Sequence, residues 1–149
     1  MGGGGEIQIE ILTAVCLRDS SAWSQLVIFP EGATSNGKAI LTFKAGGFIP
    51  GVAVQPVMIR YPNLHDTTSW TWDQHHGAVL CILYTMTQLY VRAEITFLPC
   101  YSPSLEEQSS AQLFADNVRS HMASQAGLPL CDLTYSQIKQ QFRNKNKQQ

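Results

Sequence analysis

Residues 29 to 44 contain the side chains of this sequence that are best suited to bind a polar ligand. Glu31 stands next to Gly32 in a segment that also carries hydroxyl, amide and lysine side chains. These neighbours are Thr34, Ser35, Asn36, Lys38 and Lys44. Backbone N–H groups, hydroxyls and a lysine ammonium together suit a phosphate, and a carboxylate can accept a hydrogen bond from a substrate hydroxyl. Because Glu-Gly turns are common, an exposed turn with a solvated glutamate is the alternative interpretation.

The histidines and cysteines form no pattern that predicts a metal site or a catalytic thiol. His75 and His76 are adjacent, but no cysteine, histidine or carboxylate stands at a known ligand spacing from them. A hydrolase that uses Cys81 or Cys100 with His76 needs only that the side chains meet in space. However, no glycine-flanked nucleophile elbow accompanies either cysteine. We therefore expect no bound metal and treat the cysteines as free thiols.

The segments that would position residues 29 to 44 are strands of an α/β domain. Gln25 to Phe29 is an apolar run ended by proline and glycine, which is typical of a buried strand that opens into a ligand-binding loop. Val52 to Ile59 indicates a second buried strand. Pro56 lies within it and predicts a strand edge or a bulge, because proline donates no ladder hydrogen bond. Tyr90 to Leu98 alternates apolar and polar residues, as in a strand with one polar face.

Two helices are expected to flank this sheet. From Ser110 to Ala126 apolar residues recur every four positions, and Gly127 supplies a stop. Gly77 to Val91 carries no charged residue, and a helix is expected from Gly77 to Leu89. As a helix it would be too short for the roughly 30 Å hydrocarbon core of a bilayer, which leaves a buried core helix or a helix in the membrane interface. Ile7 to Leu17 is compatible with a strand or a short helix.

Composition limits the kind of partner this protein has. The chain of 149 residues fits one domain. Charged residues make up 14% of it, well below the usual value of about 25%. A surface with so little charge suits contact with lipid or with another protein segment. The net charge of -1 and the lack of a basic cluster, apart from a tail from Lys139 to Lys147, argue against nucleic acid as a partner.

Three motifs follow one another in the first half of the chain. They are Phe29-Pro30-Glu31-Gly32, Phe43-Lys44-Ala45-Gly46-Gly47-Phe48 and Val54-Gln55-Pro56-Val57. In this order they resemble the third and fourth sequence blocks of the glycerolipid acyltransferases. Asn36, Arg60-Tyr61-Pro62-Asn63 and the segment from Asp66 to Trp72 resemble the lysophosphatidylcholine acyltransferase branch in particular. The resemblance covers residues 21–135 as the C-terminal part of an acyltransferase domain, with an unmatched leader at 1–20 and a polar tail at 136–149.

The resemblance implies a fold, a reaction and a set of binding residues. It implies a partial α/β domain with a mixed β-sheet flanked by helices. The reaction would move an acyl group from acyl-CoA, used as a substrate and not as a cofactor, to a lysophospholipid such as lysophosphatidylcholine. The site would be at a membrane lipid surface, on the cytosolic face of the endoplasmic reticulum. Its substrate-binding residues would be Phe29, Pro30, Glu31, Gly32, Asn36, Lys44, Pro56 and Arg60.

The family's catalytic pair is absent from these 149 residues. In the family a histidine acts as the base, an aspartate five residues later orients it, and both precede the Glu-Gly block. The histidines of this chain all follow Glu31, and none has an aspartate five positions on; they are His65, His75, His76 and His121. A positioned base contributes about 10² to 10⁴ in rate, so we expect the isolated chain to be inactive. The alternative is a noncatalytic, lipid- or partner-binding short product of an acyltransferase gene.

Overall fold

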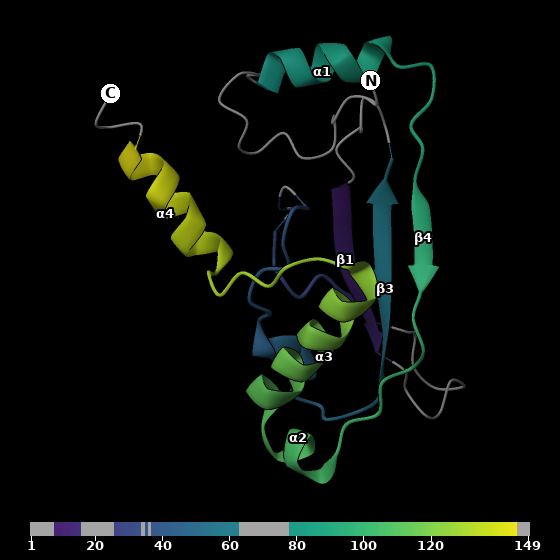
Figure 1. The fold of residues 1–149 in the computed structure, drawn as a ribbon, viewed down its shortest axis with the longest axis vertical. Coiled ribbons are helices and arrows are strands. Elements are labelled where there is room, and N and C mark those ends of the chain that lie inside the picture. Colours follow the sequence, from purple (N-terminus) through teal and green to yellow (C-terminus); the bar gives the residue numbers. More distant parts are fainter. Residues whose placement is uncertain (1–7, 16–25, 34, 36, 63–77, 146–149) are drawn as a thin grey trace.

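A computed structural model describes residues 8–15, 26–33, 35, 37–62 and 78–145 of the chain. Its sheet has four strands in the order β2-β1-β3-β4, and each neighbouring pair is antiparallel. The strands are β1 (Gln8–Val15), β2 (Val27–Ile28), β3 (Val54–Tyr61) and β4 (Glu94–Phe97). Figure 1 shows β1 and β3 side by side at the centre of the molecule, with β4 outside β3.

Helices flank this sheet, and the expected α/β class is confirmed. The helical elements are η1 (Ala45–Phe48), α1 (Ala78–Thr87), α2 (Leu105–Ser109), α3 (Ala111–Ala126) and α4 (Tyr135–Lys145). All the ladders of the sheet are antiparallel, and the parallel pairing among the described residues is an isolated bridge between Ile40 and Leu130. Gln25 lies outside the described residues, and within 26–29 Val27 and Ile28 pair with β1, so the expected strand is short. Leu26, Val27 and Phe29 are exposed, so the expectation of a buried strand is wrong.

Pro56 lies in the middle of an interior strand, where a bulge accommodates it. Val57 pairs with Phe97, whereas Val54 pairs with Tyr101, so the outer segment has one residue more than β3 between these two pairs. The Pro56 carbonyl accepts a hydrogen bond from the Leu98 N–H at 2.9 Å. The N–H that proline lacks therefore falls within the irregular stretch, where a regular ladder does not need it. The prediction of an edge or a bulge at Pro56 is confirmed as a bulge.

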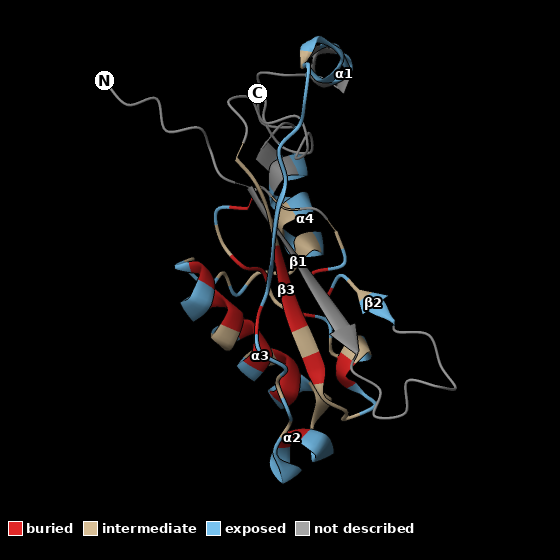
Figure 2. Cartoon of the chain, turned by 90° about the vertical axis from the view of Figure 1, so that its right-hand side faces the viewer, coloured by how far each residue is buried: buried red, intermediate tan, exposed pale blue. Residues whose placement is uncertain are grey.

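Helix α3 packs against one face of the sheet, where its side chains contact those of β3. The Ser110 side chain caps its N-terminus by accepting from the Leu113 N–H at 3.4 Å. Gly127 ends it in the left-handed region with φ of 65°, as predicted from the sequence. The buried cluster joins this helix to β3 and to η1 (Figure 2). Within the cluster the ring of Phe114 meets the ring of Phe48 edge-on, with 5.2 Å between the ring centroids.

Helix α1 lies apart from this core, and both α1 and the edge strand β4 expose apolar side chains. Val79 is 71% exposed and Met86 is 79% exposed, and Figure 1 shows α1 at the far end of the molecule from α2. The interpretation of this segment as a buried core helix is wrong. In β4 the apolar residues Ile95 and Phe97 are exposed as well, so this strand is open on both faces and not only on its polar one.

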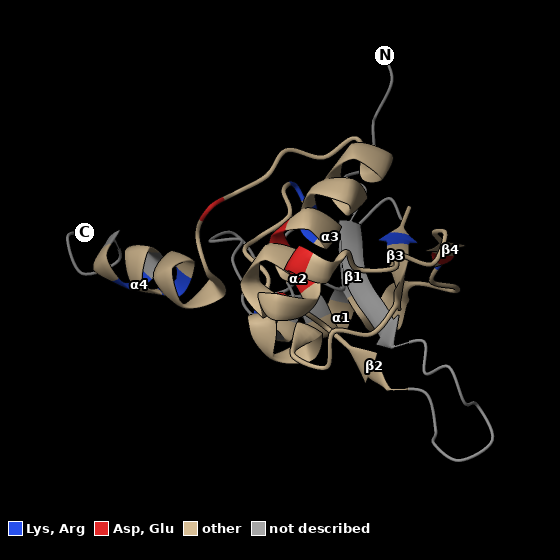
Figure 3. Ribbon diagram, turned by 90° about the horizontal axis from the view of Figure 1, so that it is seen from below, with Lys and Arg blue, Asp and Glu red and all other residues tan. Residues whose placement is uncertain are grey.

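Charge is sparse across the fold. Figure 3 shows few charged positions on the strands and on α3, and blue positions along α4. Helix α4 contains Lys139 and Arg143, both exposed, so these two basic residues lie on a solvated helix face, and Lys147 lies outside the described residues. Among the described residues, no helix combines the length and the hydropathy that crossing a bilayer requires.

Candidate functional site

The loop after β2 folds back so that two of the sequence motifs meet. The Gly32 N–H donates to the Phe29 carbonyl at 3.0 Å, which closes a tight turn over Pro30 and Glu31. The Lys44 N–H donates to the Pro30 carbonyl at 2.8 Å. The second motif thus lies against the first, although a long segment of chain separates them.

Lys44 passes directly over Gly32. A Cβ atom on Gly32 would lie 2.5 Å from the Lys44 Nζ, closer than van der Waals contact allows. Gly32 also has φ of 74°, in the left-handed region that side chains disfavour. Both facts favour glycine at this position. The result is an exposed ammonium group beside a tight backbone turn, which is an arrangement suited to an anion.

Glu31 is 9% exposed, and its carboxylate is bound within its own loop. Its Oε1 accepts from the Leu41 N–H at 2.9 Å, and the Ser35 side chain also hydrogen-bonds to the carboxylate. Burial raises the pKa of Glu31 above its ordinary value, although the bonds from Leu41 and Ser35 and the charge of Arg119 act in the opposite direction. The alternative of a solvated glutamate on an exposed turn is wrong.

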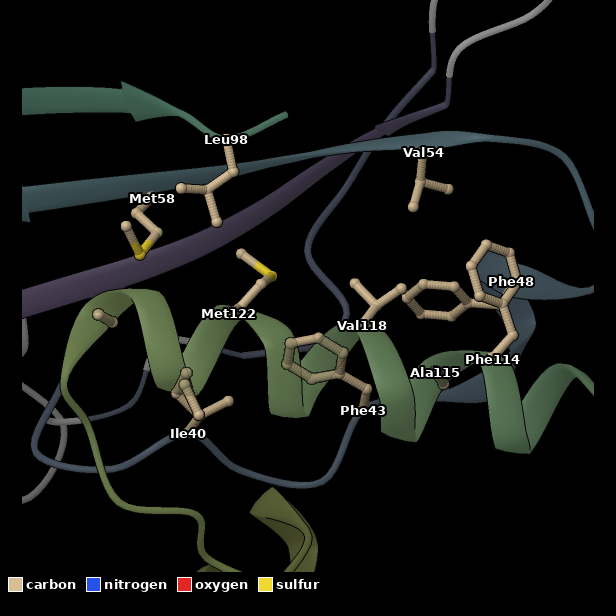
Figure 4. Packing of buried hydrophobic residues seen from close by; sticks show 12 residues of the cluster. Ile40, Phe43, Phe48, Val54, Met58, Leu98, Phe114, Ala115, Val118 and Met122 are labelled. Atoms are coloured by element: carbon tan, nitrogen blue, oxygen red, sulfur yellow. The ribbon is translucent and has the colours of Figure 1, made fainter. Parts of the chain in front are cut away.

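The far end of the loop is anchored on α3. Figure 4 shows Ile40 and Phe43 lying against this helix, and both side chains are buried. The Ile40 N–H donates to the Pro129 carbonyl at 3.0 Å, and the Cys131 N–H donates back to the Ile40 carbonyl at 2.9 Å. The loop is therefore fixed at one end by its own turn and at the other end by the segment that follows α3.

Arg119 of α3 lies behind the loop, and the sequence interpretation gave it no role. It is 6% exposed. Its Nη2 donates to the carbonyls of Ile40 at 3.3 Å and Cys131 at 2.7 Å, and its Nη1 lies 3.2 Å from the Asp132 carboxylate. The available signal was its helical position, since Arg119 shares one face with the buried residues Ala115 and Met122. A charged residue within an apolar stripe needs a partner, and the carbonyls supply it.

The structure brings only some of the predicted binding residues together. Phe29, Pro30, Glu31, Gly32 and Lys44 meet at the loop, with Phe29 exposed and Pro30 buried. Pro56 is fully buried inside the sheet, so its side chain shapes the interior. Arg60, further along β3, donates from Nη2 to the Ala126 carbonyl at the end of α3, at 3.2 Å. Asn36 lies outside the described residues.

No metal site appears in the part of the chain that the structure describes, and His75 and His76 lie outside that part. No three histidine, cysteine or acidic side chains of the described part gather closely enough to hold a metal ion. Cys100 is exposed and Cys131 is half-buried, and both are free thiols. His121 packs against the ring of Tyr101, with 5.8 Å between the ring centroids. The polar groups best placed to meet a ligand are therefore those of the loop and Lys44.

The chain is similar to curated proteins of one kind. It is 46% identical over 121 residues to "Lysophosphatidylcholine acyltransferase" from Drosophila melanogaster, a match that covers 81% of this chain. It is 50% identical over 113 residues, 76% of this chain, to "Lysophosphatidylcholine acyltransferase 1" from Danio rerio. With "Lysophosphatidylcholine acyltransferase 1" from Homo sapiens it shares 47% identity over 118 residues, 79% of this chain. The chain belongs to the lysophosphatidylcholine acyltransferase family.

The resemblance inferred from the three motifs is thereby confirmed. The chain spans 22% of the length of each of these lysophosphatidylcholine acyltransferases, so the match concerns about a fifth of the relatives. No protein-family model and no solved structure matches it.

Proposed function

We propose that this chain forms the acceptor-binding part of an acyltransferase that acts on a lysophospholipid such as lysophosphatidylcholine. The observation that carries this proposal is the 46% identity, over 81% of the chain, with a protein named for that reaction. The loop after β2 supports it. An exposed Lys44 ammonium beside the Gly32 turn suits a phosphodiester, which an uncharged lipid does not offer.

In the proposed reaction the donor is acyl-CoA. The free hydroxyl of the lysophospholipid attacks the thioester carbonyl carbon, an ester bond forms, and the carbon–sulfur bond to coenzyme A breaks. The hydroxyl proton must pass to a base, and no histidine of this chain has the required aspartate five positions on. We therefore propose that these 149 residues bind the acceptor and do not transfer the acyl group by themselves.

The proposed place of action is a lipid surface, on the cytosolic face of the endoplasmic reticulum membrane. Support comes from the apolar side chains that α1 and the segment after it expose to solvent, among them Val79, Met86 and Leu89. Exposed apolar surface of this kind favours contact with lipid or with another segment of protein. A lysophospholipid is delivered from such a surface.

The binding part of the proposal can be tested with the chain in solution. Backbone amide NMR would follow Gly32 and Lys44 while a short-chain lysophosphatidylcholine is added below its micelle concentration. A monoacylglycerol with the same acyl chain serves as the ligand control, because it lacks only the phosphocholine. We expect the two amides to shift with the lysolipid and not with the monoacylglycerol. Equal shifts with both lipids would contradict recognition of the phosphate.

A matched pair of lysine variants sharpens this test. Lys44→Met removes the ammonium beside Gly32, and Lys139→Met removes an exposed ammonium of α4. We expect Lys44→Met to weaken lysophosphatidylcholine binding by about tenfold, the equivalent of one lost charge-assisted contact. Lys139→Met should leave the affinity unchanged. Acyl transfer from acyl-CoA by the unmodified chain would overturn the proposal that it is inactive alone.

A further inference from the structure

The peptide bond between Ile40 and Leu41 is held from both sides by buried charged side chains. Its N–H, on Leu41, donates to the Glu31 Oε1 at 2.9 Å. Its carbonyl, on Ile40, accepts from the Arg119 Nη2 at 3.3 Å. In a trans peptide the N–H and the carbonyl point in opposite directions, and the described residues contain no cis peptide bond. The Glu31 carboxylate and the Arg119 guanidinium therefore lie on opposite sides of one peptide unit.

The charges match the dipole of this peptide. The carboxylate meets the positive N–H end and the guanidinium meets the negative carbonyl end, so each charge stabilises the peptide in one orientation. Arg119 also fixes the segment after α3 through the Cys131 carbonyl at 2.7 Å. A single buried arginine thus connects the loop to two other segments of the fold.

We propose that Glu31 and Arg119 are positioning residues that clamp the Ile40–Leu41 peptide and so set the shape of the acceptor loop. In this role Glu31 does not contact the lysolipid. The carboxylate is buried, and its hydrogen bonds go to Leu41 and Ser35 of its own loop. Arg119 is 6% exposed and lies on α3, so it too acts on the acceptor only through the loop. This inference rests on the proposed function for the loop.

The clamp matters for binding because it fixes the chain that leads to Lys44. The loop is tied at its start by the bond from the Lys44 N–H to the Pro30 carbonyl, at 2.8 Å. It is tied at its end by the clamped peptide at Ile40 and Leu41. Residues 40–43 are also held by the bonds of Ile40 to Pro129 and Cys131 and by the bond from the Thr42 N–H to the Leu133 carbonyl at 3.3 Å. Loss of the clamp therefore does not release this stretch, but it lets the Ile40–Leu41 peptide reorient, which shifts the Lys44 ammonium from its place over Gly32.

The first arm of the test measures the clamp directly through hydrogen exchange of the Leu41 amide. Glu31→Ala removes the acceptor, and Arg119→Met removes the donor to the other end of the peptide. We expect both to speed exchange at Leu41 by about tenfold. The amides of Val118 and Met122 in α3 serve as the internal reference, because a general loss of stability would speed them equally. Unchanged exchange at Leu41 in Arg119→Met would overturn the clamp.

Conservative variants separate positioning from contact with the lipid. Glu31→Gln keeps an oxygen that can accept from the Leu41 N–H, so we expect exchange and lysophosphatidylcholine affinity close to those of the unmodified chain. Glu31→Ala and Arg119→Met should both weaken that affinity about tenfold. If Glu31→Gln weakens binding as much as Glu31→Ala while the Leu41 amide stays protected, Glu31 contacts the lipid and the positioning role is wrong.

Two further variants keep the test decisive. Ser120→Ala is the control next to Arg119, because Ser120 lies on the exposed side of α3. The Ser120 hydroxyl donates to the Asp116 carbonyl at 2.8 Å and not to the loop. This variant should alter neither readout. If Arg119→Met does not fold, Arg119→Lys is used, because one ammonium cannot replace the planar fork of donors. If the unmodified chain binds no lysophosphatidylcholine, the proposed function is wrong, while exchange at Leu41 still decides whether the clamp exists.

Discussion

Glu31 and Glu107 are both buried in this fold, yet the pKa values of their carboxyl groups are shifted in opposite directions. Burial raises the pKa of Glu31, and the bonds from Leu41 and Ser35 and the charge of Arg119 compensate only in part. For Glu107 burial acts in the same direction, but the hydrogen bonds outweigh it and hold the pKa below its ordinary value. The difference between the two sites is the number and quality of donors that each carboxylate receives.

The donors at Glu107 come from three parts of the scaffold. The Tyr101 hydroxyl and the Asn117 Nδ2 each donate to Oε1 at 2.7 Å, and the Ser104 N–H donates to Oε2 at 2.6 Å. The same contact, with burial as the larger cause, raises the pKa of Tyr101 to about 12. Glu107 thus joins the bulged strand end, the α2 cap and α3. The scaffold thus supplies its buried acid with enough donors to offset burial, whereas the loop offsets the burial of Glu31 only in part.

The largest expected effect comes from removing the satisfied carboxylate. Glu107→Ala leaves the Tyr101 hydroxyl, the Asn117 amide and the Ser104 N–H without their acceptor. We expect the free energy of unfolding to fall by about 2–4 kcal/mol, measured by urea denaturation at pH 7. Glu106→Ala, at an exposed position of the same helix, is the matched control and should cost about 0.5 kcal/mol or less. Equal losses in the two variants would contradict the role of Glu107 as a shared acceptor.

The cap at the Glu107 site has a signal that is local in the sequence. Ser104 and Glu107 have the spacing of a capping box, which the structure contains. The site at Glu31 could not be predicted in the same way. Its carboxylate is buried in a loop that is held by Arg119 through the Ile40 carbonyl, and Arg119 is distant in sequence and reaches the loop only once α3 has packed. The motif located the loop correctly, but it could not show that the acid faces inward.

Helix α1 marks a different limit of the sequence. Its uncharged composition fits a buried helix as well as an exposed one. Composition shows that a surface is apolar, but it does not show which part of the protein, if any, covers that surface. The described side chains of α1, such as Ile82 and Met86, are exposed. The prediction for α3 succeeded because its periodic apolar positions meet the sheet within this chain.

The next expected effect is an opposite dependence of stability on pH. The lowered pKa of Glu107 means that its contribution is present above the ordinary glutamate pKa of about 4.3 and is lost as pH falls through the folded value. The raised pKa of Glu31 means that its ionisation costs stability as pH rises from about 4.3 through the folded value. Glutamine variants remove each titration separately while they keep similar shape.

We expect Glu107→Gln to lower the free energy of unfolding at pH 7 by about 1–2 kcal/mol, with a difference that shrinks below about pH 4.3. Glu31→Gln should be neutral or slightly stabilising at pH 7, because it removes the cost of burying a charge. Denaturation curves from pH 3 to pH 7 would measure both differences. Differences of the same sign and the same pH dependence would show that the two acids do not differ in the way described.

The smallest expected effect on stability comes from replacing one glycine of the loop and one glycine of the scaffold. Gly32 has φ of 74° and Gly127 has φ of 65°, so alanine at either position should cost about 1 kcal/mol for the left-handed backbone. A Cβ at Gly127 meets nothing within 4 Å, whereas a Cβ at Gly32 would displace the flexible end of Lys44. Gly46→Ala, with no such φ and open space around it, should change stability by less than about 0.5 kcal/mol.

Stability alone therefore does not separate the two glycine variants, but lipid binding does. Gly32→Ala moves the Lys44 ammonium away from the turn, so we expect lysophosphatidylcholine affinity to fall by about tenfold. Gly127→Ala costs the same backbone strain at the end of α3 and leaves Lys44 in place, so the affinity should not change. Titration of each folded variant with the short-chain lysolipid measures this. If Gly127→Ala lowers the affinity as far as Gly32→Ala does, binding follows overall stability, and the fixed place of Lys44 is not what recognises the phosphate.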